Sequence, residues 1–202
     1  NILCEKPITN TSAEAKKLMN LAKKHKAQIL VNYNRSYYKS YEQLALAIKN
    51  KKWGPIQSIS VRYTNGIFNT ATHAINLLEK MFGPITKVQS IKKSTHSNDP
   101  VVSFVGEIRG INVFFEGVGA TKYRLFEIDI MFTKARIILN NDVLTEYVPN
   151  AKNKFAFLKV GKPSISITVK NMMLEVYENV YGVIKNSKKP KCDISSALQS
   201  LI

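Results

Sequence analysis

Residues 1–33 read NILCEKPITN TSAEAKKLMN LAKKHKAQIL VNY, in which two short apolar runs flank a helix-forming segment. Residues 2–4 are typical of the end of a short buried strand. Thr11 opens a capping box, which predicts a helix over about 12–25. Residues 28–31 predict a second strand, buried on both faces. A strand, a helix and a strand in this order predict a βαβ unit of a parallel sheet.

A single βαβ unit cannot form a domain alone, because most of its parallel sheet would lack partner strands. We therefore expect an amino-terminal part of the protein ahead of Asn1, which is not an initiating methionine.

Beyond residue 33 the pattern indicates a different architecture. Ile59, Val61 and Tyr63 alternate with polar residues, as in a half-buried strand. Further strands are expected at about 85–91, 101–108, 111–119, 124–132, 136–139, 143–148 and 155–160. Helices are expected at about 41–48, 70–82, 167–186 and 195–201, the third of them covering one face of the sheet. The predicted fold class is α+β, with an open, mainly antiparallel sheet covered by helices on one face and preceded by the incomplete βαβ unit.

Composition narrows the functional classes. The chain has 202 residues, 45% of them hydrophobic, and no apolar run approaches the ~20 residues of a membrane helix. The net charge of +16 raises nucleic acid as a partner, but the lysines are spread along the chain without a nucleic-acid-binding motif. We therefore expect no nucleic acid and no membrane partner. Steep salt dependence of binding to random DNA would instead indicate a nucleic-acid binder.

The two cysteines, Cys4 and Cys192, stand outside any CxxC pair or Cys/His cluster with zinc spacing. Two lone thiols fit a reducing compartment, and the amino-terminal residues lack the features of a signal peptide. The expectation is a cytoplasmic protein without a metal site.

Four segments, in this order, resemble motifs of the Gfo/Idh/MocA family, the relatives of glucose–fructose oxidoreductase and inositol dehydrogenase. They are CEKP at 4–7, VNYNRSY at 31–37, GIFNTATHAINLL at 66–78 and DISSAL at 193–198. The resemblance covers nearly the whole chain, and the order and spacing of the segments make it specific.

The resemblance implies a domain organisation and an activity. Residues 1–33 would be the C-terminal remnant of an NAD(P)-binding Rossmann domain. Residues 34–186 would form a substrate and oligomerisation domain, and residues 187–202 would return toward the Rossmann domain. The complete protein would move a hydride between NAD or NADP and a hydroxyl-bearing carbon of a sugar, nucleotide sugar or polyol. It would assemble as a homodimer or homotetramer through the open sheet.

The resemblance also assigns site residues. The catalytic residues would be Lys6 and His73. The residues that contact substrate or cofactor would be Asn34, Arg35, Asn69 and Asn76 on the substrate side and Glu5, Lys6 and Pro7 on the cofactor side. Lysine and histidine suit this chemistry, because removing a hydride from an alcohol carbon requires the hydroxyl proton to leave as well. A nearby ammonium group stabilises the developing alkoxide.

Two positions depart from the family pattern. Asn69 and Asn76 stand where the family usually has aspartate, four residues before and three after His73. On a helix, a spacing of four puts Asn69 and His73 on one face, where the amide can orient the ring but cannot stabilise an imidazolium. The proton relay would therefore be altered, or Lys6 would carry more of it.

The chain contains no GxGxxG turn, so the main dinucleotide site would lie outside it. We expect the chain alone to bind the cofactor poorly and to be inactive. The alternative is a non-catalytic dimerisation or interaction module of the same fold. An exposed row formed by Phe126, Ile128 and Ile130 would fit this module and the enzyme alike.

Overall fold

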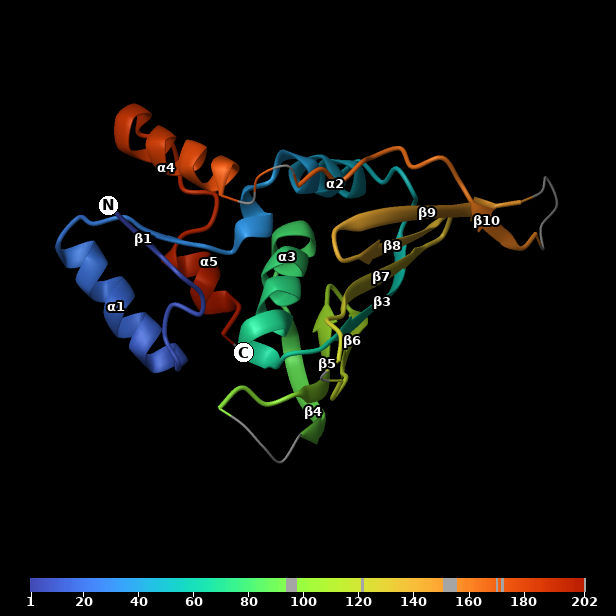
Figure 1. Ribbon diagram of the computed structural model, residues 1–202, viewed down its shortest axis with the longest axis horizontal. Coiled ribbons are helices and arrows are strands. Elements are labelled where there is room, and N and C mark those ends of the chain that lie inside the picture. The colour runs from blue at the N-terminus through green and yellow to red at the C-terminus, as the bar shows by residue number, and fades with distance from the viewer. Residues whose placement is uncertain (94–97, 121, 151–155, 170, 172, 202) are drawn as a thin grey trace.

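The computed structural model describes residues 1–202 except 94–97, 121, 151–155, 170, 172 and 202. Its described strands form a two-stranded parallel sheet and an eight-stranded sheet. In Figure 1 the small sheet lies at one side with α1, α4 and α5, and the large sheet lies at the other side with α2 and α3 against it. The predicted α+β class is confirmed.

The small sheet is the predicted βαβ unit. Strand β1 (Ile2–Cys4) pairs in parallel with β2 (Ile29–Val31), and α1 (Ser12–Lys24) connects them. The capping box is present, because the Thr11 hydroxyl accepts the backbone N–H of Glu14 and the Glu14 carboxylate accepts the backbone N–H of Thr11. The local signals of the sequence thus set both the start of α1 and the order of the unit.

The large sheet has the strand order β10-β9-β8-β7-β3-β6-β5-β4. Its pairings are antiparallel except for β3 with β6. Arg109 and Gly110, both at positive φ, form the predicted hairpin turn between β5 and β6. The strands are β3 (Ile56–Tyr63), β4 (Thr86–Lys93), β5 (Val102–Ile108), β6 (Ile111–Gly117), β7 (Phe126–Phe132), β8 (Arg136–Asn140), β9 (Val143–Pro149) and β10 (Leu158–Val160).

One face of the large sheet holds the main hydrophobic core. Helices α2 (Lys39–Lys49) and α3 (Thr72–Phe82) pack on it, and their side chains, such as Leu44 and Leu78, belong to one buried cluster with Ile59. The row formed by Phe126, Ile128 and Ile130 belongs to this core, with exposed fractions of 5, 1 and 0%. The expectation of an exposed apolar row was therefore wrong, because the alternation of β7 directs these residues under the helices.

Helix α4 also differs from the expectation. It spans Leu174–Asn186 rather than 167–186, and its buried residues include Val176 and Val183. Val176 packs into a second cluster with β2, α1 and α5 (Ile194–Gln199), so α4 does not cover the sheet. The large sheet already has α2 and α3 on that face, and the small sheet offers α4 a free apolar surface instead.

The C-terminal segment returns to the small sheet. Asp193 forms an antiparallel bridge with Leu30, and the Val31 N–H donates to the Cys192 carbonyl at 3.0 Å. The Tyr37 hydroxyl lies between the Val31 and Cys192 carbonyl oxygens, at 2.9 and 3.2 Å. Residues close to both ends of the chain thus share one core.

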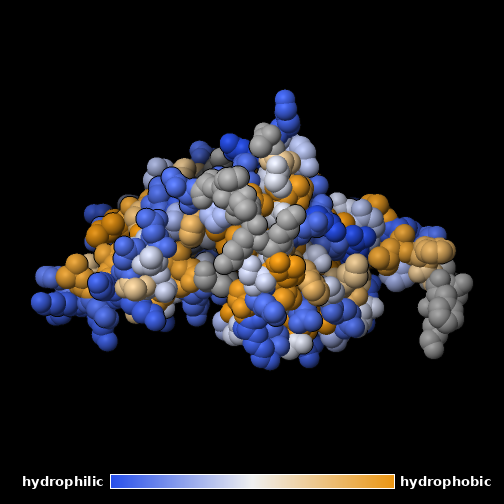
Figure 2. All heavy atoms as spheres, turned by 90° about the horizontal axis from the view of Figure 1, so that it is seen from below, coloured by the Kyte–Doolittle hydropathy of each residue, from blue (hydrophilic) through white to orange (hydrophobic). Residues whose placement is uncertain are grey.

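Figure 2 shows hydrophilic residues distributed across the visible face rather than gathered in one patch. This agrees with the spread of lysines along the sequence. None of the helices in the described part of the chain is both long and apolar enough for a membrane span.

Candidate functional site

The candidate site forms where the loop after β1 meets the turn ahead of α3. Lys6 follows the carboxyl end of β1, and its ammonium donates to the Phe68 carbonyl at 3.2 Å and to the Asn69 carbonyl. The side-chain oxygen of Asn69 lies 3.5 Å from the same nitrogen. A residue of the loop after β1 is thus held against the turn ahead of α3, more than 60 residues along the chain.

Burial alters the acidity of Lys6. Desolvation lowers the pKa of its ammonium to about 8, with a further lowering by Arg35 that is opposed by the charges of Asp99 and Glu5. Such an amine is mostly protonated at neutral pH and can still release its proton.

The turn ahead of α3 is η2 (Ile67–Ala71), which has a π-type hydrogen-bond pattern. Its backbone N–H groups at Phe68 and Asn69 donate to the two carboxylate oxygens of Asp99, at 2.7 and 2.9 Å. Gly66, at φ +82°, has no room for a side chain, since an added Cβ would lie 2.1 Å from the Asp99 carboxyl carbon. Glycine at position 66 therefore permits the close approach of Asp99.

The sequence gives no local signal for the role of Asp99. This residue lies between β4 and β5, 31 residues from Phe68. An aspartate that caps backbone N–H groups is recognisable in sequence when it is a few residues away, as at a helix N-cap, but not at this separation.

His73 lies in the first turn of α3. Its Nδ1 is buried, and no described residue gives it a hydrogen-bond partner. The ring packs edge-to-face on Tyr33 with the centroids 5.7 Å apart. Burial first, and then the charges of Lys6 and Arg35, lower the pKa of the imidazole to about 2. His73 is therefore neutral at physiological pH.

The expected pairing of Asn69 with His73 does not form among the described residues. Asn69 lies in the π-type turn rather than in α3, so the four-residue spacing of an α-helix does not apply between the two positions. The side-chain oxygen of Asn69 faces Lys6 instead.

Arg35 comes from η1 (Asn34–Tyr37), directly after β2. Its guanidinium forms two hydrogen bonds of 2.8 Å with the Asp142 carboxylate and stacks over the Phe126 ring at 4.0 Å. The Tyr41 hydroxyl donates to the same carboxylate. Arg35 lies close enough to Lys6 and His73 for its charge to lower both of their pKa values.

Three more of the predicted site residues, Glu5, Pro7 and Asn34, have local features of their own. Glu5 accepts a 2.8 Å hydrogen bond from the Asn32 side chain, so the ends of the two parallel strands are joined. Pro7 follows Lys6 through a cis peptide bond. The Asn34 side chain accepts the backbone N–H of Arg35 at 2.9 Å, within η1 itself.

Asn76 is turned away from Lys6. It is buried, accepts a 2.6 Å hydrogen bond from the Ser36 hydroxyl and donates to the Ser200 hydroxyl at 3.1 Å. These contacts join α3 to η1 and to the segment after α5.

The arrangement suits proton transfer beside a ligand. Lys6, Arg35 and His73 form a group with two cations and one neutral imidazole at the carboxyl ends of two parallel strands, which is where ligands bind in open α/β sheets. Within the described residues, no three His, Cys, Asp or Glu side chains are grouped so that they could hold a metal ion.

Comparison with known proteins gives a family match for residues 1–33. They match the model of the GFO_IDH_MocA family, described as "Oxidoreductase family, NAD-binding Rossmann fold". No curated protein matches the sequence.

Solved structures resemble the chain over almost its full length. A putative NADPH-dependent oxidoreductase from Desulfitobacterium hafniense superposes with a TM-score of 0.82 at 18% identity, covering 100% of this chain and 67% of that one. UDP-N-acetylglucosamine 3-dehydrogenase GnnA from Acidithiobacillus ferrooxidans gives 0.76 at 12% identity, over 98% and 66%. A super-repressor mutant of Gal80p from Saccharomyces cerevisiae gives 0.77 at 15% identity, over 98% and 67%.

The fold is therefore one that oxidoreductases have, and the chain spans about two thirds of the length of these structures. Residues 1–33 match the NAD-binding Rossmann-fold model of the Gfo/Idh/MocA family, which confirms the resemblance predicted from the sequence motifs.

Proposed function

We propose that the complete protein is an NAD- or NADP-dependent oxidoreductase that acts on a hydroxyl-bearing carbon of a sugar, nucleotide sugar or polyol. The observation that carries the proposal is the position of Lys6. Its amine lies at the carboxyl end of β1, is held by the η2 carbonyls and has a pKa lowered to about 8 beside the neutral His73.

The residues present fit the nicotinamide end of such a cofactor. Lys6 and Asn32 follow the ends of two parallel strands, and the buried side-chain oxygen of Asn32 has no hydrogen-bond partner among the described residues. Glu5, Lys6 and Pro7 would border the bound cofactor. When bound, the dinucleotide accepts or supplies the hydride, while its main contacts would come from the rest of the Rossmann domain.

We assign the transfer of the substrate hydroxyl proton to Lys6 rather than to His73. A group whose pKa lies near the working pH transfers protons best, and the Lys6 value of about 8 meets this condition. The pKa of about 2 keeps His73 unprotonated, so its imidazole acts as a hydrogen-bond partner that orients the substrate hydroxyl. Protonated Lys6 would stabilise an alkoxide as it forms.

The substrate side is assigned to Asn34, Arg35 and Asn69. Arg35 is held in one orientation by Asp142 and supplies positive charge toward Lys6 and His73. The similarity to a UDP-N-acetylglucosamine 3-dehydrogenase supports a nucleotide sugar among the candidate substrates. Asn76, which has buried hydrogen bonds to Ser36 and Ser200, is proposed to position α3 instead.

We further propose the domain boundaries 1–33, 34–186 and 187–202, with assembly through the large sheet. Pairing of Asp193 with Leu30 supports the last boundary, because it returns the chain to the small sheet. The isolated chain is expected to bind NADH only weakly. Titration calorimetry tests this directly, and micromolar binding by the isolated chain would overturn the assignment of the main cofactor site to other residues.

The activity itself is tested on the complete protein. It is mixed with NAD⁺ or NADP⁺ and a panel of sugars, nucleotide sugars and polyols, and formation of reduced nicotinamide is followed by absorbance. Turnover of one class supports the proposal. Tight cofactor binding without turnover of any class would instead favour a non-catalytic interaction module.

A further inference from the structure

A hollow lies at the other end of α3. It has a volume of about 620 Å³ and lies between the C-terminal parts of α2 and α3 and the ends of β3 and β7. Phe82, in its wall, is nine residues after His73, which corresponds to about 13 Å along a helix. This basic hollow, as we name it, is therefore separate from the Lys6 site, and its volume suits a small organic ligand.

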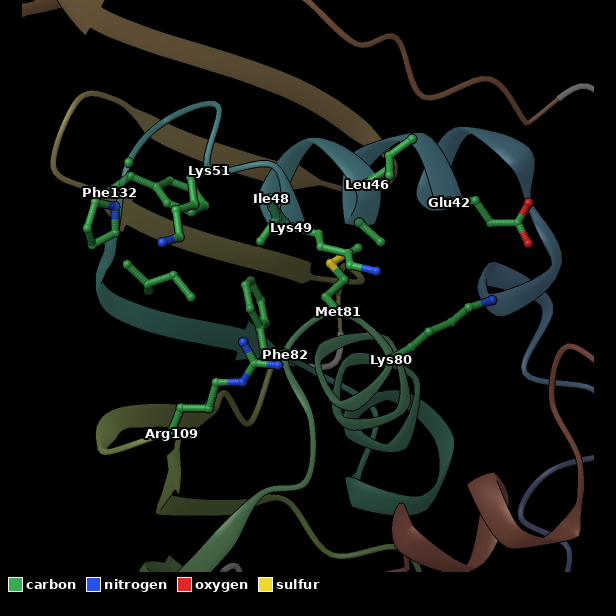
Figure 3. A pocket seen from close by; sticks show the side chains of 14 residues that line it. Glu42, Leu46, Ile48, Lys49, Lys51, Lys80, Met81, Phe82, Arg109 and Phe132 are labelled. Carbon is green, nitrogen blue, oxygen red and sulfur yellow. The ribbon is translucent and has the colours of Figure 1, made fainter.

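The floor of the basic hollow is apolar. Phe82, Met81 and Phe132 are nearly buried, with exposed fractions of 1, 9 and 8%, and Ile56 and Ile48 are partly buried against the main core. In Figure 3 Phe82 and Met81 lie near the middle of the group of side chains, and Phe132 lies at its edge. Such a floor can bind the apolar part of a ligand, because burying that part removes apolar surface from water and so favours binding.

The rim is cationic. Lys49 ends α2, Lys51 follows it, and Arg109 comes from the β5–β6 turn, and all three line the hollow. Figure 3 shows the Arg109 guanidinium reaching from its turn toward Phe82. Among the described residues these three cations have no ion-pair partner.

The only acidic residue that lines the hollow within the described chain is Glu42, and its charge is already met by Lys191 at 2.8 Å. Lys80, the fourth cation in the wall, donates to the Ser36 carbonyl. The hollow therefore has an excess of positive charge that nothing in the described structure balances.

We propose that the basic hollow is a binding site for a small organic phosphate with an apolar, ring-bearing body. A phosphate monoester carries between one and two negative charges at neutral pH, which suits several cations. Arginine can bind two phosphate oxygens at once, and lysines add point charge. The apolar floor adds affinity for the ring that inorganic phosphate lacks. This proposal is independent of the oxidoreductase activity, since it concerns other residues.

Phenyl phosphate is the probe, with inorganic phosphate for comparison, and binding to the 202-residue chain is measured by calorimetry and NMR titration. The variant is K51N/R109N, because both residues have positive φ, 54° and 52°, which asparagine tolerates. The matched control is Lys26→Asn, an exposed lysine at φ 52° at the end of α1, away from the hollow.

Saturable binding of phenyl phosphate is expected, about tenfold tighter than binding of inorganic phosphate. K51N/R109N should weaken it by about tenfold, while K26N leaves it unchanged. Three results would overturn the proposal: no saturable binding, equal affinity for inorganic phosphate, or equal weakening by K26N. Circular dichroism of each variant checks that the fold is retained.

Discussion

Lys6 and Asp99 bind the same two residues of the η2 turn from opposite directions. The Asp99 carboxylate accepts the N–H groups of Phe68 and Asn69, and the Lys6 ammonium donates to the carbonyls of the same residues. The opposite charges thus fix a short piece of backbone between them. The position of Lys6 at the candidate site depends on this turn.

Substitution of Gly66 by alanine should destabilise the protein more than substitution of Gly110. Both glycines have a φ of +82°, where alanine is strained, and the ψ of 165° at Gly66 lies in a region that essentially only glycine adopts. Only at position 66 would the new Cβ meet another group, the Asp99 carboxylate. Urea unfolding should show Gly66→Ala to be less stable than Gly110→Ala by about 1–3 kcal/mol. Equal losses would mean that Asp99 moves aside freely.

Loss of Asp142 should release Arg35. The side chains of this pair are only 17 and 22% exposed, so Asp142→Asn, which suits the φ of 69° at this position, leaves a half-buried guanidinium without its carboxylate. We expect a loss of about 1–3 kcal/mol in the free energy of unfolding. The control is Glu116→Gln, whose partner Arg62 forms an exposed pair with side chains 46 and 62% exposed. That change should cost less than about 1 kcal/mol, and a similar cost for both variants would contradict the anchoring role of Asp142.

The burial of His73 predicts a pH dependence of stability. Its pKa is lowered from 6.5 to about 2 in the folded protein, so below pH 6.5 the unfolded chain binds a proton that the folded chain does not. Stability should therefore fall as the pH drops below 6.5, by up to about 1.4 kcal/mol per pH unit from this residue. His73→Gln should reduce the slope of stability against pH between pH 6 and about 4 relative to the unchanged chain. An identical slope would show that His73 can be protonated in the fold.

The sequence predicted the elements whose signals are local. The Thr11–Glu14 capping box and the alternation of Ile59, Val61 and Tyr63 each fixed an element correctly, because the deciding contacts lie within a few residues. Which surface the apolar face of a helix packs against depends on the whole fold and not on nearby residues. For this reason α4 was expected on the large sheet, whereas Val176 packs beside β2 and α5.

For the candidate site, too, some features could be predicted from the sequence and others only from the fold. Lys6 was proposed as a site residue through the resemblance of its motif to a family motif, but its partners at 68 and 69 could be found only from the fold. The environment of His73 was also beyond the sequence, since its pKa depends on burial and on Lys6 and Arg35, which come from other elements.

We propose that Lys6 transfers the proton that accompanies hydride transfer, and the pH–rate profile of the complete protein is the decisive measurement of this role. Oxidation of the best substrate is measured for the unchanged protein, for Lys6→Met and for the surface control Lys26→Met. We expect a rate that rises with an apparent pKa near 8 in the unchanged protein and in the control. Lys6→Met should lose about 100-fold or more in rate. A Lys6→Met protein with an unaltered rate and profile would contradict the claim.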